Sequence, residues 1–453
     1  MQKLIESIFN IKLGQIQKLE TVGDGDCLIS YIRLKRSDDM YCPICNIRLI
    51  GNGIKQKQIN HKVLTDRNMK LIYEANRYRC KRCGYSTFEK NPFAIKGFNN
   101  SILVMNQVMI DLHDYRLNYT MIGQKNNISA NEVIKYFDSF VVVPHIPLPT
   151  NLGIDEIHSD MAKRKNASYL CTLTDNDEFK LVDILTSRSK YELALFFENY
   201  SEKEREAVKY VTIDMWKPYK DIALKWLPNS VIAVDPFHLS EHLSLDFTKI
   251  RIKIMNSKIY GSNSYYLLKH WHKLLESDKY NLNNEPKYNH VFKCKLNYGD
   301  LLKMLLELDD ELTLAYELKE SYRNFNKHST YETASRDLDE LISLFQKANI
   351  KEYQEFVDIM IAWKQEIINS FIISDATGHR LSNAKSEAMN QNIKTHIRIS
   401  KGLANFSRFR KRMLYCFNDK LFVVLTEKLT TMKRDLKQKH LKQKHKEERN
   451  KKL

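Results

Sequence analysis

Three acidic residues have the types and positions that metal-dependent chemistry on a phosphodiester requires. Asp155 and Asp214 each end an apolar, strand-like run, and Glu387 lies in a helical run. Carboxylates about 4 Å apart repel by roughly 4 kcal/mol per pair at an effective dielectric of about 20. Divalent cations relieve this repulsion, and two of them can stabilise the attacking and the leaving oxygen of a phosphodiester. The three acids therefore predict a site for two magnesium or manganese ions.

The order of elements between residues 150 and 242 is expected to bring two of these acids together. Strands are predicted at 153–159, 169–173, 179–185, 210–213 and 231–234, with helices at 189–200 and 218–226. Three antiparallel strands, a crossover helix and two parallel strands follow the order of the ribonuclease H-like fold. The first and fourth strands of that fold are neighbours. Asp155 and Asp214 are thus predicted side by side, although either aspartate alone is more often a cap or turn residue.

The helix predicted at 383–398 has two different faces. One face is polar and carries Glu387, Gln391, Lys394 and Arg398. The other face is apolar and carries Met389, Ile393 and Ile397. The apolar face can be buried while the polar face directs an acid and two cations at a DNA backbone. A solvated charged face is the alternative.

Asp235 also ends a predicted strand and is the rival of Asp214 as the second carboxylate. Asp214 is preferred, because its strand is predicted to lie next to the strand of Asp155. His238, three residues after Asp235, is interpreted as orienting the scissile strand or hydrogen-bonding Asp235. A structural pair at a strand end is an equal alternative.

Two C-x-x-C pairs predict a second metal site near the N-terminus: Cys42 with Cys45, and Cys80 with Cys83. Each pair can form a turn that directs two thiolates at one ion, and Gly84 relieves the backbone after the second turn. Four thiolates around one tetrahedral zinc ion form a closed, structural site. Four unligated buried cysteines are the alternative.

A third pattern is typical of two short helices joined by a turn. The predicted helix, turn and helix are Tyr119–Lys125, Asn126–Ser129 and Ala130–Phe137. Ser129 is the predicted N-cap of the second helix, which in a DNA-binding helix-turn-helix enters the major groove. Asn131 and Lys135 would then face DNA, although ordinary helical hairpins show the same pattern.

Composition favours a nucleic-acid partner. The chain has 453 residues and a formal net charge of +17 at pH 7, which is typical of a protein that meets a polyanion. Hydrophobic residues make up 43%, so the charge does not indicate wholesale disorder. No apolar run approaches the roughly 18 residues of a membrane span, and the first residues lack a signal-peptide pattern. The cysteine pattern fits a reduced cytoplasm better than a disulfide framework.

The fold class predicted for the chain is α+β with several domains. Six parts are expected: a zinc-binding domain (1–90), a helix-turn-helix domain (91–147), the first part of the catalytic core (148–242), a helical insertion (243–370), the second part of the core with the acidic helix (371–430) and a basic tail (431–453). The apolar periodicity of the insertion, which is almost free of Gly and Pro, predicts that it is all-helical.

Further basic residues could contact DNA. In the insertion these are Lys249, Arg251, Lys253 and Lys258, predicted as a wall of a DNA channel. A scaffold that only positions Glu387 is the equal alternative. Arg408 and Arg410 flank an aromatic residue and suit a DNA backbone, though such runs are common on surface helices. The tail is expected to contact DNA electrostatically or to be disordered when free.

The chain resembles the ISL-three family of bacterial insertion-sequence transposases along nearly its whole length. The resemblance is carried by the C-x-x-C module, the helix-turn-helix, Gly153–Glu156, Ile213–Tyr219, Asp235–His238, Leu381–Asn390 and Lys401–Phe406. Two departures from the family pattern are mild: Pro236 replaces a commonly basic residue, and Ala384 with Lys385 replaces a Gly-Pro-like pair. Neither departure touches the three acids.

The resemblance implies a ribonuclease H-like DDE transposase in which Asp155, Asp214 and Glu387 match the metal-binding triad. Such an enzyme would bind the terminal inverted repeats of its element, cleave the DNA ends and join them to target DNA. Because two ends are cut together, a homodimer or higher assembly on double-stranded DNA is expected. It would work in the bacterial cytoplasm, at the nucleoid, with no membrane partner. A non-catalytic DNA-binding regulator and a metal-dependent nuclease without strand joining are the rivals.

Overall fold

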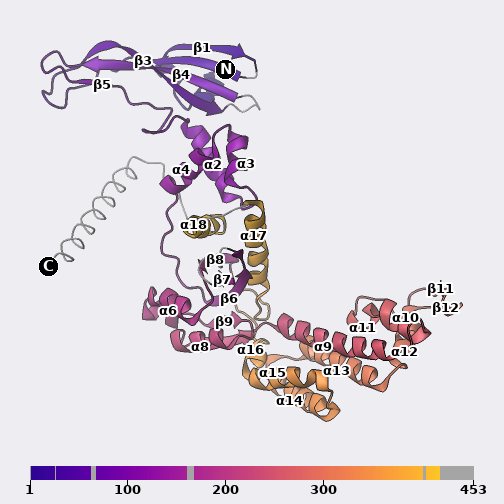
Figure 1. The fold of residues 1–453 in the computed structure, drawn as a ribbon. Helices are drawn as coiled ribbons and strands as arrows, with labels where there is room; N and C mark the ends of the chain where they lie inside the picture. The colour runs from indigo at the N-terminus through magenta and orange to yellow at the C-terminus, as the bar shows by residue number, and fades with distance from the viewer. Residues whose placement is uncertain (1, 26, 63–67, 161–167, 401–404, 419–453) are drawn as a thin grey trace. The chain divides into compact units, whose positions relative to one another are not determined.

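The computed structural model describes residues 2–25, 27–62, 68–160, 168–400 and 405–418. It contains both helices and sheets, so the predicted α+β class is confirmed (Figure 1). By compactness the chain forms two units, Met1–Pro144 with Thr395–Leu453, and His145–Lys394. The predicted basic tail 431–453 and most of the Lys401–Phe406 motif lie outside the described residues. Within the described part, no helix is both long and apolar enough to cross a membrane.

The first unit begins with a five-stranded sheet. Its elements are α1 (Gln2–Phe9), η1 (Leu13–Gln15), β1 (Ile16–Asp24), β2 (Cys27–Leu34), β3 (Ile50–Lys62), β4 (Asn68–Arg79) and β5 (Ser86–Phe88). The strands lie in the order β1-β2-β4-β3, with β5 paired to β4. Alternate residues Leu71, Tyr73 and Ala75 of β4 are buried in the core of this sheet. That spacing is the period of two expected for a strand with one buried face.

Four further helices belong to the described part of the first unit. They are α2 (Ile102–His113), α3 (Tyr119–Asn126), α4 (Ala130–Phe140) and α18 (Phe406–Cys416). The two helices and the turn predicted between residues 119 and 137 are present, and Ser129 and Glu132 form a capping box at the start of α4. Gly123 is required where α3 meets the turn, because a Cβ there would lie 2.7 Å from the carbonyl oxygen of Ile128.

Helix α18 packs with the N-terminal helices. Buried Arg412 donates to the carbonyl oxygen of Asp114 at 3.1 Å, and the Tyr415 hydroxyl donates to that of Met109 at 3.0 Å. The segment 371–430, predicted as one part of the catalytic core, therefore contributes to both compact units. The physical reason is that the buried face of α18 finds its packing partners on α2 to α4.

The second unit is built around a five-stranded sheet with the order β10-β9-β6-β7-β8. Its strands are β6 (Asn151–His158), β7 (Tyr169–Asp175), β8 (Lys180–Leu185), β9 (Tyr210–Ile213) and β10 (Val231–Val234). The pairs β6–β7 and β7–β8 are antiparallel, whereas β6–β9 and β9–β10 are parallel. The prediction that the first and fourth strands are neighbours is confirmed by the pairing of β6 with β9.

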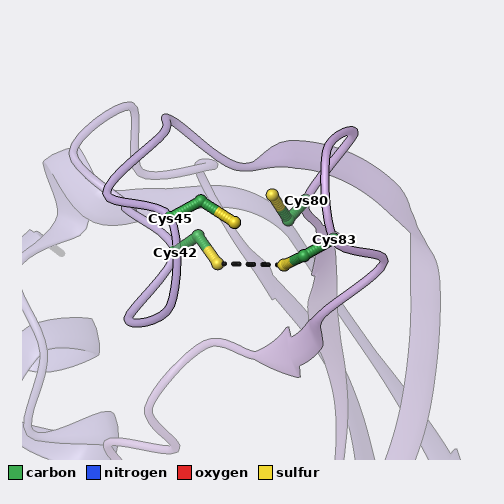
Figure 2. Close-up of side chains that lie close together, drawn as sticks. All are labelled: Cys42, Cys45, Cys80 and Cys83. Atoms are coloured by element: carbon green, nitrogen blue, oxygen red, sulfur yellow. Dashed lines mark hydrogen bonds between the residues drawn. The ribbon is translucent and has the colours of Figure 1, made fainter.

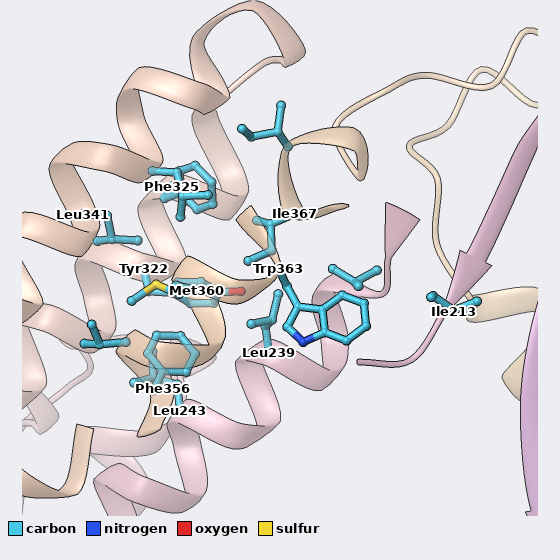
Figure 3. Close-up of a cluster of buried hydrophobic side chains, with 14 of the residues drawn as sticks. Ile213, Leu239, Leu243, Tyr322, Phe325, Leu341, Phe356, Met360, Trp363 and Ile367 are labelled. Atoms are coloured by element: carbon cyan, nitrogen blue, oxygen red, sulfur yellow. The ribbon is translucent and has the colours of Figure 1, made fainter. Parts of the chain in front are cut away.

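Helices of this unit pack on the sheet and extend beyond it. Those before the last strand are α6 (Lys190–Glu198), α7 (Glu202–Glu206) and α8 (Lys217–Trp226). Those after it are α9 (Pro236–Ser257), α10 (Asn263–His270), α11 (Lys273–Glu276), α12 (Tyr298–Leu306), α13 (Asp310–His328), α14 (Tyr331–Ala348), η2 (Lys351–Tyr353), α15 (Gln354–Ala362), α16 (Lys364–Asn369) and α17 (Ala384–Ser400). One hydrophobic core continues from Ile213 on the sheet through Leu239 and Trp363 into the helices (Figure 3). The insertion and the sheet therefore share one core.

The prediction of an all-helical insertion is wrong in one place. Strands β11 (Lys287–Asn289) and β12 (Cys294–Leu296) pair as an antiparallel hairpin. The residues before the hairpin are rich in asparagine, whose side chains compete for backbone hydrogen bonds, and they end at Pro286, which cannot continue a helix. The side chain of Asn289 then accepts from the backbone N–H of Val291 at 3.0 Å, within the loop of the hairpin.

Candidate active site

Asp155 and Asp214 lie at the same level on neighbouring strands of the second sheet. Ile154 of β6 pairs with Ile213 of β9, so the two aspartates are the next residues along parallel strands. Asp214 directly follows the last residue of β9, as expected. Asp155 differs from the prediction, because it lies inside β6 and not at its end. The strand continues because β7 pairs with its other edge as far as His158.

Asp155 is buried and held by hydrogen bonds. Its Oδ2 atom accepts from Asn390 Nδ2 at 2.7 Å, and its Oδ1 atom accepts from the backbone N–H of Glu156 at 2.6 Å. Burial, together with the negative charge of Asp214, raises the pKa of Asp155 to about 7. A carboxyl group in this environment is stabilised by a nearby cation or by a proton.

Asp235 and Glu387 form the other half of the acidic cluster. The ligand atoms of both residues and of His238 lie within 4.8 Å of one another. Burial raises the pKa of Asp235. Burial and the charge of Asp235 raise the pKa of Glu387. The structure thus places Asp235, which the sequence suggested only as a rival or accessory residue, beside Glu387.

His238 connects the two halves of the cluster. Its Nε2 atom lies 3.0 Å from Asp214 Oδ1 and 3.9 Å from Glu387 Oε1. The hydrogen bond to Asp214 raises the pKa of His238 to about 9, so the imidazole is positively charged at neutral pH. A hydrogen bond to Asp235, one of the interpretations of His238 from the sequence, is replaced by this contact with Asp214. Asp235 instead caps α9, accepting from the backbone N–H of Phe237 at 3.1 Å.

Two buried asparagines beside Glu387 hold the carboxylates of the sheet. Asn383, just before α17, donates from Nδ2 to Asp214 Oδ1 at 3.3 Å. Asn390, one turn after Glu387, donates to Asp155 and accepts from the hydroxyl of Thr172 at 2.8 Å. Helix α17 and the residue just before it therefore contribute Glu387 together with the amides that orient both aspartates. Neither amide was predicted from the sequence, although both lie within the Leu381–Asn390 motif.

Gly153 determines how closely α17 approaches the sheet. Ser386 is fully buried, bonds to the hydroxyl of Thr174, and donates to Asn176 Oδ1 at 2.9 Å. A Cβ at residue 153 would lie 2.2 Å from Ser386 Oγ and 2.6 Å from Asn176 Nδ2. Only glycine leaves this space, so Gly153 sets the position of the residue next to Glu387. A glycine inside an apolar strand was the sequence signal for this contact.

Glu156 follows Asp155 but is neutralised by a separate contact. Its carboxylate accepts from Arg188 at 2.5 and 2.6 Å. The Arg188 guanidinium lies 4.4 Å from the ring centroid of Tyr169 and 4.3 Å from that of Trp216. Successive side chains of a strand point to opposite faces, and on its own face Glu156 is paired with Arg188 outside the acidic cluster.

The four cysteines of the C-x-x-C pairs come together in the first unit. Their sulfur atoms lie within 4.8 Å of one another, and the Cys42 and Cys83 sulfurs are 3.5 Å apart (Figure 2). No disulfide joins them. A hydrogen bond from the backbone N–H of Cys83 lowers the pKa of Cys80 to about 7, which favours a thiolate. This donor set suits a tetrahedral zinc ion, as the sequence predicted.

Comparison with protein families assigns the chain to one of them. The sequence profile of the ISL-three DDE family, described as transposase, matches residues 152–413, which is more than half of the chain and includes the whole acidic cluster. The chain belongs to this transposase family. A comparison with curated proteins found no match. A transposase acts on DNA, so the exposure of the residues predicted to contact DNA bears on its function.

Helix α4 of the transposase carries two of the predicted DNA contacts. Asn131 and Lys135 are both exposed. Lys135 is also engaged within the protein, because its Nζ atom lies 4.6 Å from the ring centroid of Phe98 and donates to the Gly97 carbonyl oxygen at 3.2 Å. Asn131 is therefore the more available of the two side chains.

The remaining predicted contacts lie on α17 and α18 of the transposase. Lys394 is half-buried and Arg398 is exposed on α17. On α18, Arg408 forms a two-point ion pair with Asp138, with distances of 2.8 and 3.1 Å, and Arg410 is half-buried. The charge of Arg408 thus helps to fasten α18 to α4.

Proposed function

We propose that this transposase binds the terminal inverted repeats of its element, cleaves the DNA ends and joins them to target DNA. The single observation that carries the proposal is the convergence of the acids. Asp155 and Asp214 are level on paired strands, and His238 Nε2 lies 3.0 Å from Asp214 Oδ1 and 3.9 Å from Glu387 Oε1. These three residues are the proposed ligands of two magnesium or manganese ions, with Asp235 and His238 as accessory residues.

The sheet topology supports a ribonuclease H-like core. Read from the other edge, its order is β8-β7-β6-β9-β10, with β7 antiparallel to both neighbours and β9 and β10 parallel to β6. The first, second and third strands of that fold are antiparallel neighbours, and the fourth lies beside the first. Asp214 and Asp235 follow the carboxyl ends of β9 and β10, where α/β sheets commonly place their sites.

The donor set fits hard divalent cations, which prefer carboxylate and amide oxygens. Asp155, Asp235 and Glu387 all have raised pKa values, as expected for crowded acids that a cation would stabilise. Asn383 Oδ1 is buried without a hydrogen-bond partner among the described residues, so it is a further oxygen for an ion or its water. When bound, the ions would activate the attacking oxygen and stabilise the leaving oxygen of the phosphodiester.

The chain itself contributes preorganisation. His238 and Asn383 both contact Asp214 Oδ1, and Asn390 holds Asp155 Oδ2. These bonds fix the two carboxylates in one orientation before DNA arrives, which is the usual role of residues that surround metal ligands. The positive charge of His238 also offsets the repulsion between the acids.

Recognition of the repeats is assigned to the first unit. The α3–α4 pair has the layout of a helix-turn-helix, and α4 with Asn131 and Lys135 is the proposed groove-reading helix. The zinc-binding cluster would stabilise the adjacent sheet, and Lys394, Arg398, Arg408 and Arg410 would contact the DNA backbone. Since two ends must be cut together, the active species is a homodimer or larger assembly on DNA.

The test is strand cleavage and joining on a plasmid that carries the element with its own ends. Asp155→Asn, Asp214→Asn and Glu387→Gln should each lower cleavage by about a thousandfold or more, since several kcal/mol of charge stabilisation is lost. DNA binding should stay near the wild-type level in gel-shift assays. Glu198→Gln is the matched control, because Glu198 is exposed on α6 and lies outside the acidic cluster.

The outcomes separate the proposal from its rivals. Loss of cleavage in Asp235→Asn but not in Asp214→Asn would move the second metal ligand to Asp235. Cleavage without any joined product would identify a nuclease. Repeat binding without cleavage by the wild-type protein would identify a regulator.

A further inference from the structure

The hairpin β11–β12, which the helical prediction missed, carries three exposed lysines: Lys287, Lys293 and Lys295. The stretch from residue 287 to 297 contains no aspartate or glutamate. Within the described part of the chain, no carboxylate forms a salt bridge with any of the three lysines. The hairpin itself is therefore positively charged, and its three lysines form no salt bridge among the described residues.

The basic residues of α9 and of its C-cap, Lys258, behave differently. Lys249 pairs with Asp246 at 2.7 Å, and Lys253 pairs with Glu311 at 3.0 Å. Arg251 is buried and donates to the carbonyl oxygen of Leu268 at 3.0 Å. Lys258 lies 3.7 Å from Asp309. These contacts favour the scaffold alternative for α9 over the predicted wall of a DNA channel.

The hairpin is fixed from one side only. Asn289 is buried and accepts from the backbone N–H groups of Val291 and Phe292 at 3.0 and 3.3 Å. Phe292 and Leu296 pack on the hydrophobic core of the unit. The opposite face carries the cross-strand pair of Tyr288 and Lys295, both exposed. Lys287 pairs with Leu296 but is still exposed, and exposed Lys293 lies in the loop between the strands. Figure 1 shows the hairpin beside α10 and α12 at one end of the insertion.

We propose that the hairpin β11–β12 is a second DNA-contacting surface, whose three lysines bind phosphates of double-stranded DNA. Its charge matches DNA, and two strands about 4.8 Å apart fit a major groove about 12 Å wide. A groove-inserted ribbon needs a rigid base and a free face, and the hairpin has both. This inference rests on the proposed DNA function, and it assigns part of the substrate contact to the insertion.

The experiment compares two triple variants with the same change in net charge. Lys287, Lys293 and Lys295 are replaced by alanine in the first. Lys327, Lys347 and Lys351, which are exposed elsewhere on the insertion, are replaced by alanine in the control. Binding to a labelled random-sequence duplex is measured by fluorescence anisotropy over a range of salt concentrations.

Loss of three phosphate contacts should reduce the salt slope by about three. Between about 50 and about 200 mM salt, the wild-type affinity should then fall about 40-fold more than that of the hairpin variant. The control variant should retain the wild-type slope. A photo-activatable cross-linker on exposed Cys294 should also capture the duplex, and Cys294→Ser should abolish this capture.

Each contrary result would lead to a different conclusion. An unchanged slope in the hairpin variant, with no cross-link from Cys294, would overturn the inference while leaving the proposed function intact. A wild-type slope combined with a loss of self-association in sedimentation experiments would make the hairpin a protein interface. Absence of DNA binding by the wild-type protein would overturn the proposed function itself.

Discussion

The two clusters of this transposase that suit metal ions differ in how the chain assembles them. The cysteine cluster uses two turns that each supply two donors. The carboxylate cluster draws its donors from the ends or interiors of β6, β9 and β10 and from α17, over more than 200 positions of sequence. The first cluster depends on local geometry, and the second depends on strand register and helix docking.

This difference predicts that the two clusters respond differently to mutation and to loss of the cation. A cation at the cysteine cluster would hold two turns of a small sheet together, so its loss should affect folding. The carboxylate cluster is mounted on a large hydrophobic core. Changes there should affect chemistry first and stability second.

The largest effect is expected from removal of zinc. The protein should contain one zinc ion per chain, and chelation should unfold roughly the first 90 residues but leave the second unit folded. Structural zinc contributes about 10–16 kcal/mol to small zinc-binding domains. Metal analysis by atomic spectroscopy, followed by limited proteolysis with and without chelator, measures both outcomes.

Two cysteine variants provide the control for zinc removal. Cys45→Ser should reproduce the effect of chelation, whereas Cys294→Ser, at an exposed cysteine outside the cluster, should not. A folded first unit that contains no zinc would contradict the prediction.

Disturbing the close contact between Gly153 and Ser386, next to the carboxylates, should have almost as large an effect as removal of zinc. Gly153→Ala introduces a Cβ 2.2 Å from Ser386 Oγ, so α17 must move away from β6. We expect a stability loss of about 1–3 kcal/mol and a larger loss of cleavage, because Glu387 moves with the helix. Chemical denaturation and the plasmid cleavage assay measure the two effects.

Gly23→Ala is the matched control for this contact. Gly23 also lies in a strand, and a Cβ there meets no atom within 4 Å. Wild-type cleavage by Gly153→Ala would show that the position of α17 does not depend on this glycine.

The amide that orients Asp155 should have an intermediate effect. Asn390→Ala removes the donor 2.7 Å from Asp155 Oδ2, and loss of such a partner lowers metal affinity by about 10- to 100-fold. The magnesium dependence of cleavage should shift to higher concentration, with cleavage partly restored at saturating metal. Gln346→Ala, at an exposed amide on α14, should leave the metal dependence unchanged.

The smallest effect concerns the other end of α17, where His396 is buried in the first unit. Burial lowers the pKa of His396 to about 4, below the value of about 6.5 expected in the unfolded chain. The unfolded state therefore binds the proton more tightly, so the stability from neutral His396 is complete above pH 6.5 and is lost as the pH falls toward 4.

At about pH 5.5 this loss should be roughly 1 kcal/mol for the first unit. Denaturation of the wild-type protein and of His396→Gln at neutral pH and at pH 5.5 measures it. The difference in stability between the two proteins should shrink at the lower pH. An equal difference in stability at both pH values would place His396 in a more solvated environment than the structure shows.

Much of the local architecture followed from the sequence. The cysteine pairs, the cap at Ser129, the strand that ends before Asp214 and the helix that carries Glu387 all depend on residues a few positions apart. The pairing of β6 with β9 also followed, because a crossover between parallel strands restricts their order. These features are determined by periodicity and turn chemistry, which a single sequence displays directly.

The choice of partners across the fold was decided only by the tertiary structure. His238 bonds Asp214 and not Asp235, and α18 packs with the N-terminal helices. The cations of α9 are paired inside the insertion, whereas those of the hairpin β11–β12 are not. The physical reason is that each of these side chains had several chemically equivalent partners in the sequence. Packing of distant segments selects one of them, and that selection leaves no local pattern to read.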